Sequence, residues 1–557
     1  MGTTALPPTG LLCELIAHPE RTAIGTPQPH FGWVCNDLGR DARQAGFQIL
    51  VASAPERLAR DEGDLWDSGV PRLADGWVTD SRSIGIPYAG KPLQPNSRYW
   101  WKVRTWNARY EPSLYSEPQE FRAGELLAEY VAARQPLLTT LVEPVRVVQT
   151  APDRTFVDFG RAAFATLELT LPAAAAGQSV QVNLGEVPDG PHGIHRNPGG
   201  TRRYRELTVA LPEGTHTVRV AIPPDARNTN RKRTANTPPA VLMPDGMPEV
   251  LPFRYAELCG YPAPVGREQV RQVAVHHLFD DGAARFVSSN PVLNDVWELC
   301  RYSMKATSFL GLYVDGDRER IPYEADAYIN QLGHYGCDRE YSMARRTIEH
   351  LFQNPTWPTE WCLFMPLLVW ADYEHTGDLR LADRHYDDLR AKCLLPLARP
   401  DGLISTQNVP PEILASVHLQ CPLKDIVDWP QCERDGYDLR PINTVVNAFH
   451  YRAVVLLARL AEALGKGADA RDLNRHAAAV RRAMLERLVD PAQGLFVDGE
   501  GSAHISLHGN LFPLAFGVVP EATAPGIAAY LGRRGMVCSV YAAQFLLEAL
   551  YRAGAGE

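Results

Sequence analysis

The sequence predicts a multidomain protein in which two β-rich domains precede an all-α domain made of helix hairpins. Three observations support this fold class. The chain has 557 residues, which is too many for one hydrophobic core. Short runs of alternating apolar and polar residues dominate its first half, and apolar residues at helical spacing dominate its second half. We expect domains at residues 1–125, 126–285 and 286–557.

The first domain has the pattern of a small β-sandwich. From about Phe31 to Phe121, the runs AGFQILVAS, WVTDSRS and SRYWWKVRTWN are separated by Gly, Pro and Asn. Period-two alternation rich in aromatic and β-branched residues, with frequent turn residues, is typical of sandwich strands. The second domain has longer and more widely spaced strand candidates, which favours a jelly roll. These candidates are RTFVDFG, ATLELTLP, SVQVNLGEV, THTVRVAIP and PFRYAEL.

The third domain begins at SSNPVLNDVWELCRYSM. Asn290 is a suitable helix N-cap and Pro291 suits the first turn. The residues that then fall on one helical face are Leu293, Val296, Trp297, Cys300 and Met304. Further helical segments are REYSMARRTIEHLF, WCLFMPLLVWADY, LADRHYDDLRAKCLLPLA, NTVVNAFHYRAVVLLARLAEALG, DLNRHAAAVRRAMLERL and SVYAAQFLLEALYRAG. The loops between them contain acids and tryptophans, which predicts a ring of hairpins with a pocket built from loops.

Composition and charge exclude several classes of function. The net charge of −9, from 56 basic and 65 acidic residues, gives no basic surface of the kind that binds nucleic acid. The ten cysteines include no C-x-x-C pair, so neither a zinc cage nor a disulfide framework is expected. The N-terminus lacks the pattern of a secretory signal, and no apolar run is long enough to cross a membrane. We expect a cytoplasmic protein with reduced thiols, and homo-oligomerisation is left open.

The segment VDGDRERIPYEADAY, residues 314–328, carries five carboxylates and two arginines. Glu319 lies between the arginines and follows two aspartates. Close like charges raise the pKa of a carboxyl and guanidiniums lower it, so such a cluster can be tuned in either direction. On composition alone, a solvent-exposed mesh of salt bridges at a helix start is the simpler interpretation. The Ile-Pro-Tyr sequence that follows favours instead a partly enclosed position, where a general acid would be useful.

Two further segments combine tryptophans with acids. In NPTWPTEW, Trp357 and Trp361 flank Glu360. Flat apolar rings beside a carboxylate suit a sugar, whose C–H face packs on aromatic rings while its hydroxyls need acceptors. Two core tryptophans at a helix start are the competing interpretation. In DIVDWPQCERDGYD, Asp428 precedes Trp429, and acidic loops of this kind also occur as calcium-binding surfaces or as solvated faces.

Other chemistries have little support. His504 and His508 have the spacing of a helical metal site, but no glutamate follows the first histidine and no third ligand is evident. The sequence has no G-x-S-x-G elbow, no P-loop and no dinucleotide-binding glycine motif. We therefore expect no metal and no cofactor, and calcium is without support.

Taken together, these segments resemble the bacterial α-L-rhamnosidases of glycoside hydrolase family 78. The resemblance rests on VDGDRERIPYEADAY, NPTWPTEW, HISLHGNLFPLAFGVVP and GMVCSVYAAQFLLEAL, and it covers nearly the whole chain. It implies a fibronectin type III-like sandwich, a jelly roll and an (α/α)6 toroid. It also implies an inverting glycoside hydrolase that releases terminal α-L-rhamnose. In such enzymes one carboxylic acid protonates the leaving oxygen and a carboxylate base activates water on the opposite face.

The resemblance also assigns roles to residues. The general acid of the family matches Glu319. The expected substrate-binding residues are Asp315, Arg318, Asp326, Trp357, Glu360, Trp361, Asp428, Trp429 and His508. The substrate would be a rhamnose-containing glycoside or oligosaccharide. Many family members have Gly-Trp where this chain has Pro322 and Tyr323, and we expect this difference to affect specificity beyond the rhamnose.

A second departure concerns the general base. In the family, the helix similar to SVYAAQFLLEALYRAG is followed by a segment with the base, a closing helix and a β domain, whereas this sequence ends at Glu557. We expect an incomplete toroid with an exposed apolar seam; otherwise Glu360, Asp428 or Glu433 would have to serve as base. The alternative function is a rhamnose-binding homologue without catalysis. An enzyme with the same toroid and another substrate is disfavoured by the two β domains.

Overall fold

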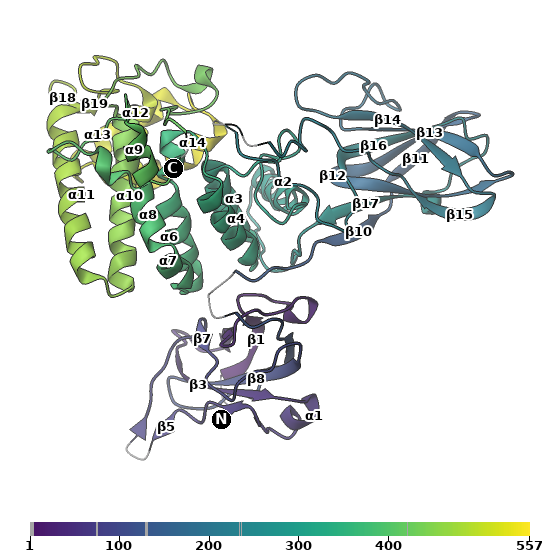
Figure 1. Ribbon diagram of the computed structural model, residues 1–557, viewed down its shortest axis with the longest axis horizontal. Coiled ribbons are helices and arrows are strands. Elements are labelled where there is room, and N and C mark those ends of the chain that lie inside the picture. The colour runs from purple at the N-terminus through teal and green to yellow at the C-terminus, as the bar shows by residue number, and fades with distance from the viewer. Residues whose placement is uncertain are drawn as a thin grey trace.

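The structure is a computed structural model, and it describes residues 5–73, 76–127, 132–232, 234, 237–419 and 421–556. Figure 1 shows two β domains beside one helical domain, with the first β domain below and the second at the right. The predicted order of β-rich and all-α parts is confirmed. None of the helices within the described residues is long and apolar enough to cross a membrane.

The first β domain packs two antiparallel sheets around an aromatic core. One sheet has the order β1-β2-β7 and the other has the order β4-β3-β8-β9. Their strands are β1 (Ala5–Cys13), β2 (His30–Asp37), β3 (Gln44–Ala52), β4 (Trp66–Asp67), β7 (Ile86–Pro87), β8 (Arg98–Asn107) and β9 (Gln119–Arg122). Phe31, Trp101 and Phe121 are buried between the sheets. The alternating runs of β3 and β8 therefore bury one face, as their period predicts.

One strand prediction in this domain was wrong. Of the run WVTDSRS, only the end of β6 (Gly76–Trp77) is a strand, and it pairs with β5 (Arg72–Leu73). The rest is irregular because its polar side chains bond locally: the Asp80 carboxylate accepts from the Arg82 backbone N–H at 3.0 Å.

The second β domain is organised around one long strand. Its described strands are β10 (Leu138–Val142), β11 (Arg146–Ala151), β12 (Arg154–Ala173), β13 (Gln178–Gly185), β14 (Tyr204–Leu211), β15 (Gly214–Arg219), β16 (Leu251–Cys259) and β17 (Val270–His276). The first part of β12 pairs with β11 and β16, and its last part pairs with β17 and β15. The runs RTFVDFG and ATLELTLP, predicted as separate strands, are both part of β12. A register shift against β16 between Asp158 and Ala163 accommodates the glycine between them.

The helical domain is a ring of helices around an aromatic core. The inner helices α3 (Glu324–Cys337), α6 (Met365–Thr376), α10 (Thr444–Ala463), α12 (Leu507–Phe516) and α14 (Val540–Arg552) contact one another in turn, and α14 contacts α3 again. Within the described residues, the inner ring thus has five helices. Outside it lie α4 (Ser342–Gln353), α8 (Tyr386–Lys392), α11 (Gly467–Arg487) and α13 (Ala524–Arg534). Shorter helices are α1 (Pro55–Leu58), α5 (Thr359–Cys362), α7 (Arg380–Arg384) and α9 (Pro411–Ser416).

Helix α12 was not predicted, and its environment explains why. All ten of its residues are buried, so its sequence LHGNLFPLAF shows no amphipathic period. It also contains Pro513, which usually indicates a helix end. Helix α13 was also missed, since its short segment APGIAAYLGRR carries two glycines.

Helices α2 (Pro291–Thr307) and α14 carry exposed apolar surface. The Asn290 side chain caps α2 as predicted, accepting from the Val292 N–H at 3.0 Å. None of the residues of α2, all of which the structure describes, is buried. Leu299 on α2 and Val540 and Tyr551 on α14 are 65%, 82% and 69% exposed. These apolar side chains are therefore in contact with solvent, and the expectation of an exposed seam stays a prediction.

The aromatic core of the ring makes a prediction about stability. Phe545 is fully buried and packs against Phe449 and Phe512. Phe545→Ala should lower the free energy of unfolding by about 3–5 kcal/mol, because it leaves a cavity between inner helices. Leu547→Ala, on the exposed face of the same helix, should change it by about 0.5 kcal/mol or less. Urea denaturation followed by circular dichroism checks both, and equal losses would contradict this packing.

Candidate active site

The acidic segment forms a loop that closes on itself before α3. The Asp315 N–H donates to the Ile321 carbonyl at 3.1 Å, and the Ile321 N–H donates to Asp315 Oδ1 at 3.2 Å. Gly316 and Arg320 have positive φ angles of 84° and 57°, which turn the chain sharply within the loop. Glu319 therefore lies in a short, tightly closed loop, which we call the acid loop (residues 315–321).

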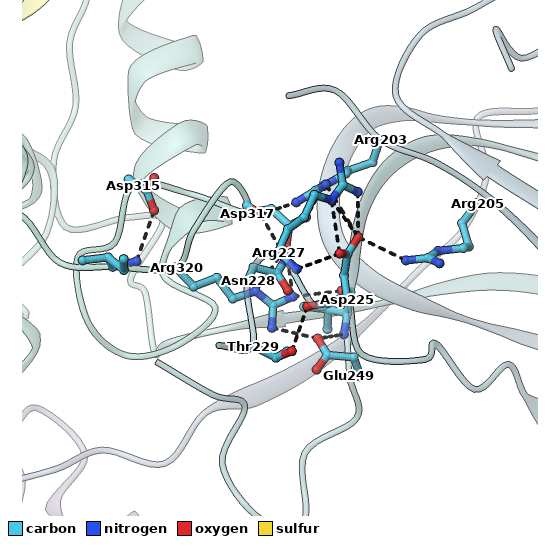
Figure 2. A network of polar contacts seen from close by, with 12 residues as sticks. Arg203, Arg205, Asp225, Arg227, Asn228, Thr229, Glu249, Asp315, Asp317 and Arg320 are labelled. Atoms are coloured by element: carbon cyan, nitrogen blue, oxygen red, sulfur yellow. Dashed lines mark hydrogen bonds and ion pairs between the residues drawn. The ribbon is translucent and has the colours of Figure 1, made fainter. Parts of the chain in front are cut away.

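The acid loop is not an exposed mesh of salt bridges, so that interpretation was wrong. Asp317 and Arg320 are only 8% and 1% exposed. Arg320 pairs with Asp317 at 2.9 Å and with Glu249 of the second β domain at 2.8 Å. Figure 2 shows these residues in one network with Arg203 and Asn228. Of the two arginines beside Glu319, only Arg318 is exposed, and it pairs with Asp315 at 3.0 Å.

Glu319 combines access to solvent with a fixed partner. Its side chain is 38% exposed. The Tyr323 hydroxyl donates to Glu319 Oε2 at 2.7 Å, and Arg318 Nη2 lies 3.6 Å from the same oxygen. Burial raises the pKa of Tyr323, and the bond to Glu319 raises this pKa further, so the hydroxyl stays protonated and donates. The Tyr323 ring meets Trp361 edge-on, with centroids 5.2 Å apart.

Two aspartates near the acid loop are destabilised as anions. Burial raises the pKa of Asp326, in the first turn of α3, to about 7, and the nearby Asp315 contributes to this shift. Burial also raises the pKa of Asp315, although the Ile321 N–H and Arg318 oppose this change. Such carboxyls bind a proton or a hydrogen-bond donor more readily than exposed ones.

Glu360 links the NPTWPTEW segment to the segment that begins at Asp425 through hydrogen bonds. Its fully buried carboxylate accepts from the N–H groups of Ile426 and Val427 at 3.1 and 2.7 Å. The backbones of the same two segments bond directly, because the Thr359 N–H donates to the Lys424 carbonyl at 3.1 Å. Burial raises the pKa of Glu360, and Asp425 raises it further. NPTWPTEW and the start of DIVDWPQCERDGYD thus form one paired wall.

Asp428 and His508 form a buried pair at the end of that wall. Asp428 Oδ2 lies 2.7 Å from His508 Nε2 and accepts from the Ser539 N–H at 2.9 Å. Both side chains are completely buried. His504 pairs instead with Asp498 at 2.6 Å, so the two histidines contact different carboxylates. Within the described ranges, no group of three or more His, Cys, Asp or Glu residues is arranged to hold a metal ion.

Tyr541 of α14 is electrostatically coupled to these acids, and the sequence reasoning missed it. Burial raises its pKa, and the charges of Glu360, Asp428 and Asp326 raise it further. In SVYAAQFLLEALYRAG this tyrosine is indistinguishable from a core aromatic residue. Only its coupling to three acids, which depends on tertiary structure, identifies it.

Three buried polar atoms in this region lack a hydrogen-bond partner among the described residues. They are Tyr541 Oη, Trp361 Nε1 and His508 Nδ1. Unpaired buried polar groups are rare in native proteins, because each costs about 1–3 kcal/mol. A hydroxyl group is a suitable hydrogen-bond partner for each of these atoms.

The structure thus brings most of the predicted site residues together. The charges of Asp326, Glu360 and Asp428 all raise the pKa of Tyr541, while Glu319 is linked to Trp361 through Tyr323. Trp357 and Trp429 lie on the paired loops, where Lys424 Nζ is 5.7 Å from the Trp357 ring centroid and Trp429 is 54% exposed. The predicted roles of all these residues remain predictions.

A cleft of about 710 Å³ lies beside the acid loop, between α2 and the second β domain. Asp315 and Arg318 line it, together with Tyr302 of α2 and Phe164 of β12.

Comparison with known proteins identifies relatives. Residues 281–555 match the family model of the bacterial α-L-rhamnosidase six-hairpin glycosidase domain, and residues 8–127 match the Rha78A-like N-terminal immunoglobulin domain. An α-L-rhamnosidase of Formosa agariphila is 36% identical over 104 residues, 19% of this chain and 10% of that protein. The chain thus matches only about a tenth of the length of this curated relative.

Two solved structures share the fold. The α-L-rhamnosidase from Dictyoglumus thermophilum has a TM-score of 0.74 at 15% identity. The match covers 100% of this chain and 81% of the chain of that enzyme. The Streptomyces avermitilis α-L-rhamnosidase complexed with L-rhamnose has a TM-score of 0.73 at 12% identity, and the match covers 99% of this chain and 84% of that one.

The raised pKa of Asp326 predicts how stability depends on pH. In the unfolded chain this carboxyl loses its proton near pH 4, whereas in the folded protein it does so at about pH 7. Between these values the folded state binds more protons, so the free energy of unfolding falls as the pH rises. Asp326→Asn removes this pH dependence. Between pH 4 and 7, the free energy of unfolding of the variant minus that of the wild type should therefore increase by at most about 1.4 kcal/mol per pH unit.

Urea denaturation at several pH values measures this difference. Asp387→Asn, at an exposed position on α8, is the control and should follow the wild-type pH dependence. A constant difference between Asp326→Asn and the wild type would show that Asp326 titrates like an exposed carboxyl.

Proposed function

Because the chain belongs to the bacterial α-L-rhamnosidase family, we propose that it is an inverting glycoside hydrolase that releases terminal α-L-rhamnose. The observation that carries this proposal is the group of unpaired polar atoms of Tyr541, Trp361 and His508 beside buried acids. A rhamnose ring offers hydroxyls that both donate and accept, and it has C–H faces and a methyl group that suit aromatic rings.

Glu319 is proposed as the general acid. Its exposed carboxyl would give a proton to the glycosidic oxygen while the bond from that oxygen to the anomeric carbon breaks and its electron pair stays on the oxygen. The Tyr323 hydroxyl, which already donates to Glu319, would stabilise the carboxylate left behind. Water would attack the anomeric carbon from the opposite face and lose its proton to a base.

The remaining predicted residues would bind the sugar. Asp315 and Asp326 would accept hydrogen bonds from hydroxyl groups next to the acid loop, and the Asp428–His508 pair would do so from the opposite wall. Trp361 would present its ring and its unpaired N–H to the same sugar. The leaving group would extend into the cleft lined by Arg318 and Tyr302, which adjoins the acid loop.

A second candidate function, binding of rhamnosides without turnover, is favoured by one observation. Two of the carboxylates considered as the base, Glu360 and Asp428, are fully buried and already accept hydrogen bonds from protein groups. A base that activates water needs an oxygen open to that water. If no other base acts, the site binds rhamnose and does not cleave its glycosides.

The proposed acid makes a direct prediction. Glu319→Gln should lower kcat on phenyl α-L-rhamnoside by about 100- to 10,000-fold with little change in KM, because only the proton donor is lost. Release of phenol measures this. Glu412→Gln, at an exposed site on α9, is the matched control and should keep the wild-type rate.

Calorimetry with L-rhamnose separates the two functions. Binding of the sugar together with release of nitrophenol supports hydrolysis. Binding without release by the wild type supports the second candidate, and absence of both would contradict the assignment of the site.

Tyr541 offers a test in which stability and binding change in opposite directions. Tyr541→Phe removes a buried hydroxyl without a partner, so the ligand-free protein should gain about 1 kcal/mol of stability. The same change should weaken rhamnose binding roughly five- to tenfold, because the sugar loses one hydrogen bond. Thermal denaturation and calorimetry measure the two effects. Loss of stability together with unchanged binding would show that the hydroxyl serves the fold.

A further inference from the structure

We infer that Arg203 and Asn228 of the second β domain are positioning residues for Glu319, acting through Asp317. This inference rests on the proposed function, because it assigns these residues to the same site. Figure 2 shows the network that carries it, in which groups from the second β domain and the acid loop converge on Asp317.

Asp317 is held on all its acceptor atoms by the second β domain and by Arg320. Arg203 Nε donates to Asp317 Oδ2 at 2.6 Å, and its Nη2 donates to the Asp317 carbonyl. Asn228 Nδ2 donates to the same carbonyl and to Asp317 Oδ1, each at 2.9 Å. Arg203 and Asn228 are 3% and 1% exposed, so these bonds are shielded from water.

Arg320 anchors the other side of Glu319. Its guanidinium forms an ion pair with Glu249 at 2.8 Å and donates to the Val250 carbonyl at 3.2 Å, and its own carbonyl accepts from the Val241 N–H at 2.9 Å. These contacts hold Arg320 in its left-handed conformation, with φ at 57°. The residues two before and one after Glu319 are therefore both fixed to the second β domain.

The domains also meet through an apolar contact beside this network. Phe164 of β12 stacks on Phe309 with ring centroids 3.9 Å apart, and the Arg320 guanidinium lies 5.4 Å from the Phe309 ring. The second β domain thus holds the acid loop from outside the helical ring. Glu319 itself reaches away from this contact to Tyr323.

Displacement of the loop would affect proton donation more than sugar binding. Most proposed sugar-binding groups, on α14, on α12 and on the paired loops, do not belong to the network, whereas Asp315 lies in the acid loop itself. A change at Arg203 should therefore lower kcat by a larger factor than it raises KM. The loss should also depend on the leaving group, because a good leaving group departs with little need for protonation.

The test compares Arg203→Gln, Arg203→Lys and Asn228→Ala in the full chain. Arg203→Gln should lower kcat on phenyl α-L-rhamnoside about 100-fold and on the 2,4-dinitrophenyl rhamnoside less than about threefold, with a change in KM that is the same for both substrates. Arg203→Lys keeps the charge but not the two-pronged contact, so it should lie between Arg203→Gln and the wild type. Arg205→Gln is the matched control, because Arg205 belongs to the same network but pairs with Asp225 at 3.3 Å.

Hydrogen exchange of the acid loop provides a readout that does not need turnover. The amides of Asp315 and Ile321 should exchange faster in Arg203→Gln and Asn228→Ala, and at the wild-type rate in Arg205→Gln. Equal losses on both substrates, or unchanged loop exchange in folded Arg203→Gln, would overturn the inference. If the wild type cleaves neither substrate, the proposed function fails, and the exchange rates alone decide whether Arg203 positions the loop.

Discussion

The site depends on the burial of the Asp317 carboxylate between two domains. Asp317 is in the acid loop, yet its partners Arg203 and Asn228 belong to the second β domain. Removing charges from water is costly, and that cost is offset only when each charge has well-placed partners. Since Asp317 has three partners at hydrogen-bonding distance, the loop has one favourable position. Because its neighbours Asp317 and Arg320 are buried and fixed, the partly exposed Glu319 is also held in one position.

The wall formed by the two paired loops is also fixed by a buried carboxylate with well-placed partners. Glu360 uses its buried carboxylate to hold the backbone of Ile426 and Val427, and this places Asp428 against His508 of α12. Burial raises the pKa of Glu360 on α5 and of Asp326 on α3. The protein thus keeps polar groups in an apolar ring of helices by pairing most of them with one another. Tyr541 Oη is among the buried polar atoms of the described residues that remain unpaired.

Local patterns predicted much of the fold. The alternation in β3 and β8, the cap at Asn290 and the helical spacing of α10 and α11 all depend on neighbouring residues, and the structure confirms them. Patterns failed where tertiary contacts decide. Helix α12 is buried on every side and so has no period, and β12 continues through a glycine because four strands pair with it.

In the candidate site, too, local motifs could be predicted from the sequence and tertiary contacts could not. The acids and tryptophans of three segments could be found from the sequence, because they cluster in short motifs. The roles of Arg203 and Tyr541 could not, since Arg203 lies 114 residues from Asp317 and Tyr541 lies in a helix of ordinary apolar composition. The expected mesh of exposed salt bridges failed for a related reason: no local signal shows that a separate domain buries Asp317 and Arg320.

The anomer of rhamnose first released from an aryl α-L-rhamnoside tests the account most directly. Protonation by Glu319 with attack of water from the opposite face inverts the anomeric carbon. Proton NMR spectra recorded before the anomers equilibrate should therefore show β-L-rhamnose first. Initial release of α-L-rhamnose, or no release by a folded chain that binds rhamnose, would contradict it.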